Sequence, residues 1–140
     1  MSSTYAARAY AATAVNNSVE AASPHRLIQM LYEAAIRNLR VAKSHLAKNE
    51  IPQKAQCMSK AMDIITQGLR ANLNDDAGGE IAANLRMVYD YCERQLLLAN
   101  ARNDVKLIDE VISLLEPLLT AWKQIGNQGQ PVSKSAAVPR

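Results

Sequence analysis

Residues 23–39, SPHRLIQMLYEAAIRNL, form the segment on which the fold of this 140-residue chain depends. Ser23 is a preferred helix N-cap, and Pro24 is tolerated at the first helical position because its missing N–H would be unpaired there in any case. With the following residues placed at roughly 100° each, the apolar side chains sweep about 240°, whereas an ordinary surface helix needs about 100°. The segment therefore predicts a helix that is either central in its domain or offers a second apolar face to something else. The residues on this arc are Leu27, Ile28, Met30, Leu31, Tyr32, Ala34, Ala35, Ile36 and Leu39.

The composition is typical of an all-α chain with one hydrophobic core. A length of 140 residues suits one domain, 49% of the residues are hydrophobic, and there are only five Gly, five Pro and no Phe. No run of about 18 apolar residues occurs, so no transmembrane helix is expected, and the first residues lack the apolar region of a secretory signal. Cys57 and Cys92 each lie in an apolar helical stripe and are expected to be reduced thiols. These features predict a cytosolic protein.

Apolar spacing and turn residues divide the chain into an arm, four helices and a tail. Residues 1–22 are predicted to form an N-terminal arm or a short extra helix, with Tyr10 and Val15 as groups able to anchor it. Helices are predicted from about Pro24 to Lys48, from Ile51 to about Leu73, from about Glu80 to Arg102 and from about Asp104 to Ile125. The helical domain therefore covers residues 23–126, and residues 127–140 are predicted to be a disordered tail. Four helices of similar length with short connections favour an antiparallel four-helix bundle.

Individual residues predict local features within these helices. Gly68 lowers helix propensity and would allow a neighbouring helix to approach closely. The segment NDDAGGE, residues 74–80, predicts a turn, and Asp104 is the expected N-cap of the last helix. Pro117 predicts a kink or a local break in that helix, and Gly126 predicts its end.

No group of residues predicts catalysis, a metal site or a cofactor. The Glu-x-x-His pairs of di-iron bundles do not occur, and His25 and His45 are too far apart on one helix to share a metal. No two carboxylates stand out as an acid and a base in unlike environments, and no Gly-rich phosphate loop follows a strand. The segment from Arg26 to Lys48 carries a mild basic face, but Glu33 lies within it, and nucleic-acid binders concentrate more positive charge. The sequence therefore favours neither an enzyme nor a nucleic-acid-binding protein.

The helices carry more apolar surface than a four-helix core would bury. A monomer rarely exposes a large apolar patch, so this surplus predicts a cover, which could be the arm, a second copy or a partner helix. A partner helix would lie in a groove between the first, third and fourth helices. The candidate groove residues are Ile28, Tyr32, Ile36, Leu39, Met87, Tyr91, Leu98, Ile112 and Leu119. On the first helix, Leu27, Leu31, Ala34 and Ala35 are expected to face inward instead. The alternative is that the candidate residues complete a tight core around a central helix, and periodicity does not separate the two.

Several longer motifs resemble one family. They are ASPHRLIQMLYEAAIRNL (22–39), SKAMDIITQGLRANLN (59–74), GGEIAANLRMVYDYCERQLLLANARNDVKLIDEV (78–111) and AWKQI (121–125). In this order and with these spacings they closely resemble the FliS family of flagellin-export chaperones, from about Tyr10 to Ile125. The chain departs from the family's common pattern at Ala34, where Gly is frequent, and at Pro117, which leaves the shape of the last helix open.

The resemblance implies a cytosolic bacterial chaperone built as an antiparallel helical bundle. Such a chaperone binds the disordered C-terminal segment of flagellin, prevents premature polymerisation and assists delivery to the flagellar type III export apparatus. The resemblance also implies that the N-terminal arm, including Tyr10, covers the client groove and moves on binding. A monomer or weak homodimer is expected, with no nucleic acid and no membrane insertion. The alternative is a self-associating helical scaffold without a client.

Overall fold

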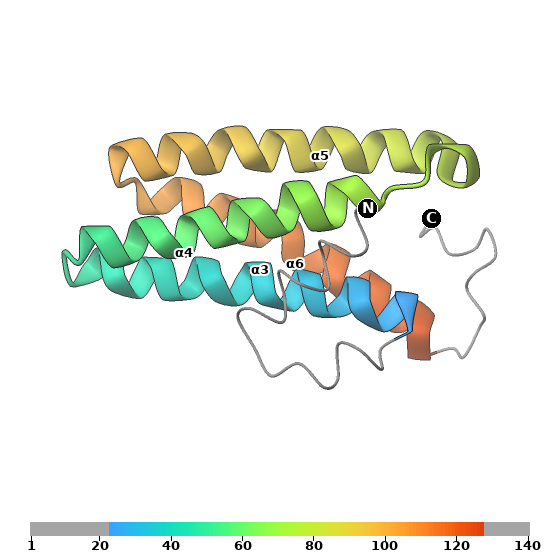
Figure 1. The fold of residues 1–140 in the computed structure, drawn as a ribbon, viewed down its shortest axis with the longest axis horizontal. Coiled ribbons are helices and arrows are strands. Elements are labelled where there is room, and N and C mark those ends of the chain that lie inside the picture. Colours follow the sequence, from blue (N-terminus) through green and yellow to red (C-terminus); the bar gives the residue numbers. More distant parts are fainter. Residues whose placement is uncertain (1–22, 128–140) are drawn as a thin grey trace.

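Four helices form an antiparallel bundle in the computed structural model, which describes residues 23–127 (Figure 1). They are α3 (Pro24–Ala47), α4 (Ile51–Asp63), α5 (Asp75–Arg102) and α6 (Val105–Asn127). Helix α3 packs against both α4 and α6, and α5 packs against the same two helices from the other side. The predicted all-α four-helix bundle is therefore confirmed. The expected arm, with Tyr10 and Val15, and the expected tail beyond Asn127 lie outside the described residues.

The helix ends follow the local signals in the sequence. The Ser23 hydroxyl accepts a hydrogen bond from the Arg26 N–H at 3.1 Å, and this N-cap begins α3. At the other end of the chain, Asp104 accepts from the Lys106 N–H at 3.0 Å after Asn103 has taken the left-handed conformation, with a φ of 52°. Each cap satisfies a backbone N–H that has no partner inside its helix. Both predicted N-caps are confirmed.

Helix α5 begins earlier than the sequence predicts. Asn74 caps a helical turn by accepting from the Ala77 N–H at 3.0 Å, so the helix starts at Asp75 rather than at Glu80. The backbone then leaves helical geometry at Gly79, where φ is 54° and ψ is −127°. Only glycine adopts these angles without steric cost, because it has no Cβ. The expected turn is therefore a kink between one capped turn and the main part of α5.

Helix α6 continues through both residues at which an interruption was expected. Pro117 frees the carbonyl of Ser113, four residues earlier, but both residues are exposed, so water can solvate that carbonyl. Gly126 lies inside the helix, and a Cβ there would be 2.3 Å from the ring of His25. The predicted kink or local break at Pro117 is therefore not a break, and the helix runs through Gly126 to Asn127, two residues beyond the predicted end at Ile125. At Gly126 the absence of a side chain leaves room for a neighbouring ring instead.

A π-helical turn continues α4 and was not predicted. This segment, η1 (Ile64–Leu69), leads into a single 3₁₀ turn, η2 (Arg70–Asn72). A π-helical turn shifts the helical register, and here both Ile64 and Ile65 are buried. A Cβ on Gly68 would lie 3.3 Å from Leu31 Cδ1, closer than most such contacts, so Gly68 does allow α3 to approach closely.

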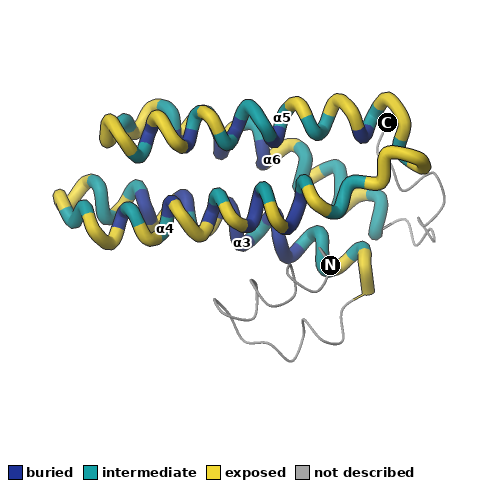
Figure 2. The backbone as a smooth tube through the Cα atoms, turned by 45° about the horizontal axis from the view of Figure 1, so that its top comes forward, coloured by how far each residue is buried: buried dark blue, intermediate teal, exposed yellow. Residues whose placement is uncertain are grey.

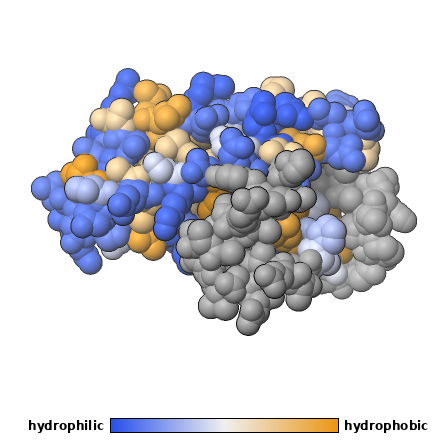
Figure 3. All heavy atoms as spheres, viewed as in Figure 1, coloured by the Kyte–Doolittle hydropathy of each residue, from blue (hydrophilic) through white to orange (hydrophobic). Residues whose placement is uncertain are grey.

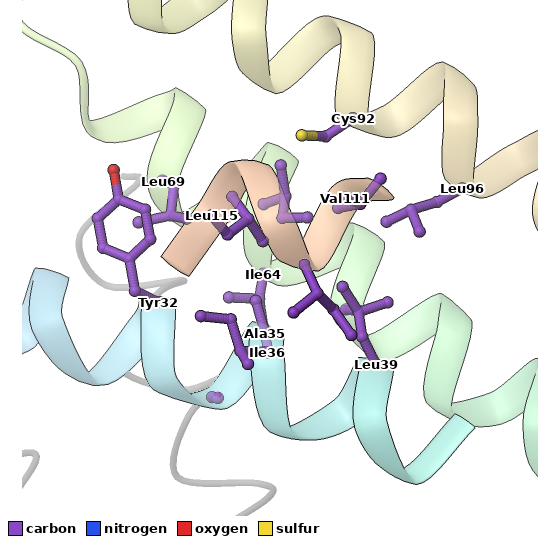
Figure 4. Close-up of a cluster of buried hydrophobic side chains, with 14 of the residues drawn as sticks. Tyr32, Ala35, Ile36, Leu39, Ile64, Leu69, Cys92, Leu96, Val111 and Leu115 are labelled. Carbon is purple, nitrogen blue, oxygen red and sulfur yellow. The ribbon is translucent and has the colours of Figure 1, made fainter. Parts of the chain in front are cut away.

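The hydrophobic core explains the wide apolar arc of α3. Eight of its residues are buried, compared with five on α5, because α3 makes more extensive contacts with α4, η1 and α6 than α5 does. Figure 2 shows the buried residues on the sides of the helices that face one another. Figure 4 shows Leu39 of α3, Ile64 of η1, Leu96 of α5 and Leu115 of α6 converging in the core. Most of the arc therefore belongs to a central helix and not to a second, free face.

One charged side chain is buried with this core. Lys54 on α4 is 2% exposed, and its Nζ donates to the Asn100 carbonyl at 2.9 Å and to Asn100 Oδ1 at 2.6 Å. Burial lowers the pKa of Lys54 below its ordinary value. The contact ties the first half of α4 to the last turns of α5.

Candidate binding surface

The structure distributes the nine predicted groove residues over four places. Leu39 and Ile112 lie in the core, and Ile28 and Tyr32 line a cavity at one end of the bundle. Ile36 and Leu119 line a hollow between α3 and α6. The remaining three, Met87, Tyr91 and Leu98, lie on α5. They therefore do not form one continuous groove.

Three residues of the expected outer face of the first helix are almost fully buried. Leu39 is 0% exposed, and Tyr32 and Ile36 are 3% exposed each. The expectation that they form a solvent-facing side of the helix is wrong, because α4 and α6 both pack against α3. Ile28 is the member of that face that is only partly buried.

The hollow between α3 and α6 has a volume of about 460 Å³ and an apolar floor. We call it the α3/α6 hollow; its lining is Glu33, Ile36, Arg37, Arg40, Val41, Ser44, Glu116 and Leu119. Ion pairs cross the seam between the two helices along its length. They join Glu33 to Lys123 at 3.9 Å, Arg40 to Glu116, and Lys43 to Asp109 at 2.6 Å. Exposed pairs of this kind add little stability, although all three bridge α3 and α6 in their antiparallel arrangement.

A smaller cavity of about 90 Å³ lies at the end of the bundle where α3 begins and α6 ends. The hydroxyl groups of Tyr32 and Tyr89 form a hydrogen bond at its wall. Burial raises the pKa of Tyr32 to about 12, and burial also raises the pKa of Tyr89 well above its ordinary value. Both tyrosines therefore stay neutral, and their polar atoms are satisfied by each other.

A pair of rings joins the two helices beside this cavity. His25 and Trp122 stack with ring centroids 4.7 Å apart and planes 6° apart. Trp122 Nε1 donates to the His25 carbonyl at 2.9 Å, and His25 Nε2 donates to the Trp122 carbonyl at 2.8 Å, since a carbonyl oxygen only accepts. The sequence indicated His25 only as a surface or helix-end group, because the ring contact spans 97 positions.

The raised pKa values of the buried groups Cys92, Tyr32 and Tyr89 predict a loss of stability at alkaline pH. Burial raises the pKa of Cys92 from 9.0 to about 12, as it raises that of Tyr32 from 10.0 to about 12. The unfolded chain therefore releases these protons first, and the free energy of unfolding falls above about pH 9 by up to about 1.4 kcal/mol per pH unit for each such group. Lys54 acts in the opposite direction, because its pKa is lowered, but the pKa values of Tyr89 and Cys57 are raised as well, so it is one group against four.

Urea unfolding followed by circular dichroism between about pH 8 and pH 11 tests this expectation. Burial also raises the pKa of Cys57, so replacing both Cys57 and Cys92 by alanine should move the start of the decline from about pH 9 to about pH 10, where the tyrosines begin to ionise. A free energy of unfolding that stays level over this range would show that these groups are not protected in the folded state.

The outer side of α5 carries an exposed apolar row, which we call the α5 strip: Met87, Tyr91 and Leu98. Met87 is 67% exposed and Leu98 is 38% exposed. Figure 3 shows apolar atoms over the end of α5 that leads into α6. The sequence predicted this second stripe on the helix from its spacing; Met87 and Leu98 are exposed, whereas Tyr91 is half-buried.

Polar contacts hold the middle of the α5 strip in place. The Tyr91 hydroxyl donates to the Glu110 carboxylate on α6, and Gln95 Nε2 donates to the same carboxylate at 2.9 Å. The hydrogen bond raises the pKa of Tyr91 and lowers that of Glu110. The Arg94 guanidinium lies 5.9 Å from the centre of the Tyr91 ring. The ring is thus fixed across the seam between α5 and α6, while Met87 and Leu98 on either side of it are open to solvent.

The described part of the chain shows no arrangement that suggests a metal centre. Between residues 23 and 127, no three or more His, Cys, Asp or Glu side chains lie close enough together to hold a metal ion. Cys57 and Cys92 are both free thiols. No helix in the same range is long and apolar enough to cross a membrane.

Comparison with known proteins gives a consistent result. Residues 6–129 match the family model described as flagellar protein FliS. The flagellar secretion chaperone FliS of Salmonella typhimurium is 47% identical over 118 residues, which cover 84% of this chain and 87% of that protein. The protein of the same name from Vibrio cholerae is 39% identical, covering 84% of this chain and 86% of that protein. The one from Bacillus subtilis is 34% identical over 108 residues, covering 77% and 79%.

Proposed function

This chain belongs to the FliS family of flagellar secretion chaperones, and we propose that its client is the disordered C-terminal segment of flagellin. In this proposal the chain binds the segment in the cytosol, prevents premature polymerisation and assists delivery to the flagellar type III export apparatus. The observation that carries the proposal is an apolar surface left open on a bundle whose core is otherwise closed. Family membership supports a role in flagellar export, and the open surface supports a protein partner.

The dimensions of the α5 strip suit a client helix. Met87 and Leu98 are eleven residues apart, which is roughly 16 Å, or about three turns of a helix. An amphipathic helix that binds in a groove places its apolar anchors over a similar length. Met87 has a flexible side chain that adapts to irregular apolar surfaces, whereas Tyr91 is held in place by Glu110. A flexible group beside a fixed ring suits a client that folds only on binding.

The energy of such a complex depends on more than its area. Burial of about 300 Å² of apolar surface would contribute about 7 kcal/mol. Ordering a disordered client costs about 2–5 kcal/mol, and the association itself has a further entropic cost. We propose that the N-terminal arm, with Tyr10 and Val15, covers the client surface in the free chaperone, which would make its release a further cost. Moderate affinity and ready release are therefore expected.

Charges placed on the α5 strip should weaken client binding. The double substitution Met87→Glu with Leu98→Glu is expected to lower the affinity for a C-terminal flagellin peptide at least about tenfold, because two carboxylates would be desolvated in the complex. Both residues are exposed, so the fold should be unchanged. Isothermal titration calorimetry with the full chain measures the affinity, and circular dichroism checks the fold.

A matched control adds the same charge on an exposed polar face. Gln53→Glu with Gln56→Glu on α4 should leave the affinity within about twofold of that of the natural chain. If the natural chain binds no flagellin peptide, and light scattering shows a homodimer that the α5 substitutions dissociate, the strip is a self-association surface and the scaffold alternative holds.

A further inference from the structure

The α3/α6 hollow lies between two of the ion pairs that cross the seam. Glu33 with Lys123 borders it on one side and Arg40 with Glu116 on the other, and Ile36 and Leu119 lie between the two pairs. Its volume of about 460 Å³ falls within the range of pockets that bind ligands. The floor is apolar, and Val41, which is exposed, extends it along α3.

The charges around the hollow are not balanced. Glu33 is close to two cations, Arg26 at 3.8 Å and Lys123 at 3.9 Å, and Arg40 is paired with Glu116. Arg37 lines the hollow and is exposed, and it forms no ion pair or hydrogen bond within residues 23–127. The rim therefore presents one uncompensated guanidinium next to an apolar floor.

We propose that the α3/α6 hollow binds a helical segment of the client that carries an apolar anchor and, one turn away, a carboxylate that pairs with Arg37. On α3, Arg37, Val41 and Ser44 are spaced as i, i+4 and i+7, so they form one row along the mouth of the hollow. A helix lying along this row would place its anchor over Ile36 and Leu119 and its carboxylate beside Arg37. This inference rests on the proposed function, because it names the chemistry of the segment that the chaperone binds.

The need for a carboxylate that pairs with Arg37 favours a segment of another chain, rather than an end of this chain, as the occupant of the hollow. Residues 1–22 contain one carboxylate side chain, Glu20, and residues 128–140 contain none. Arg37 lies fourteen residues beyond Ser23, about 21 Å along α3. The three residue steps from Glu20 to Ser23 span at most about 11 Å. Glu20 would therefore meet Arg37 only if this segment were fully extended and folded straight back along the helix. The arm could cover the floor, but it is poorly suited to supply the charge.

The test measures how the affinity for a C-terminal flagellin peptide depends on Arg37 and on the carboxylates of the peptide. Arg37→Gln is expected to weaken binding about two- to fivefold, and Arg37→Glu about tenfold, with the loss shrinking at high salt. Replacing the partner carboxylate of the peptide by its amide should have the same effect on the natural chain and none on Arg37→Gln. Lys60→Glu on α4, an exposed position with the same change of charge, is the control and should stay within about twofold.

The outcomes separate this inference from the proposed function. If the natural chain binds the peptide, but Arg37→Glu binds as Lys60→Glu does, the hollow is not the site of a charged anchor while the client assignment stands. If no flagellin peptide binds at all, both proposals are wrong. If Arg37→Glu changes only the self-association of the chain, measured by analytical ultracentrifugation without peptide, the occupant is a second copy and this inference is overturned.

Discussion

Replacing Leu39 by alanine is expected to lower the free energy of unfolding by about 2–5 kcal/mol and to leave the affinity for the client unchanged. Leu39 is 0% exposed and meets Ile64, Leu96 and Leu115 in the middle of the bundle. Truncation there removes apolar contacts on several sides and leaves a cavity that the surrounding helices cannot fully close. Urea unfolding gives the stability, and calorimetry with a flagellin peptide on the folded variant gives the affinity.

Leu119→Ala on α6 is the comparison for this variant. Leu119 is only partly buried and lines the α3/α6 hollow. Its truncation should therefore lower the free energy of unfolding by less, about 1 kcal/mol, and should lower the affinity for the client. The two variants should therefore separate into one that changes stability and one that changes affinity. A loss of affinity with Leu39→Ala at a temperature where the variant is fully folded would mean that the core residue does reach the client.

Features that depend on neighbouring residues were predicted well from the sequence. In the caps at Ser23 and Asp104, a side-chain oxygen accepts a hydrogen bond from the backbone N–H two or three residues later. Both partners therefore lie within one short stretch of sequence. The exposed row with Met87 and Leu98 follows from helical spacing alone. The exposure of Met87 and Leu98 was predicted correctly, and their contact with a client stays a prediction.

Features set by contacts between distant segments were not predicted. The inward position of Tyr32 depends on α3 having neighbours on two sides, which helical spacing cannot show. Gly126 looked like a helix end, but its role is to leave room for His25, about a hundred residues earlier. Pro117 looked like a break, but it faces solvent, where the freed carbonyl can be hydrated. For Tyr32 and Gly126 the tertiary environment outweighed the local preference of the residue, whereas at Pro117 exposure to solvent was sufficient.

The sequence contains a signal for the buried position of Lys54. Lys54 stands in the row Met58, Ala61 and Ile65, spaced as i, i+4, i+7 and i+11, so it occupies a core position of its helix. A lysine in such a row extends its apolar stem through the core and needs an acceptor for its ammonium group. The acceptor, Asn100, lies 46 positions away and follows only from the packing of α4 on α5.

Replacing Lys54 by alanine is expected to lower the free energy of unfolding by about 2–4 kcal/mol. The Asn100 carbonyl lies in the last turns of α5, where carbonyl groups run out of partners inside the helix and the helix dipole favours a cation. Alanine removes the donor to that carbonyl and also the four-carbon stem that fills the space between the helices. Lys54→Met keeps most of the stem and loses only the donor, so it should cost less, about 1–2 kcal/mol.

The pH dependence separates the charge of Lys54 from its packing. Burial lowers the folded-state pKa of Lys54 below its unfolded value of 10.5, so the unfolded chain holds the proton more tightly. Between these two pKa values, the contribution of Lys54 to stability rises with pH. The difference in unfolding free energy between the natural chain and Lys54→Met should therefore grow over this range, while the tyrosines and Cys92 contribute equally to both proteins. Lys60→Ala, at an exposed position on the same helix, should change stability by less than about 0.5 kcal/mol. An equally small effect of Lys54→Ala would show that the ammonium group is solvated and that the contact with Asn100 does not hold α4 to α5.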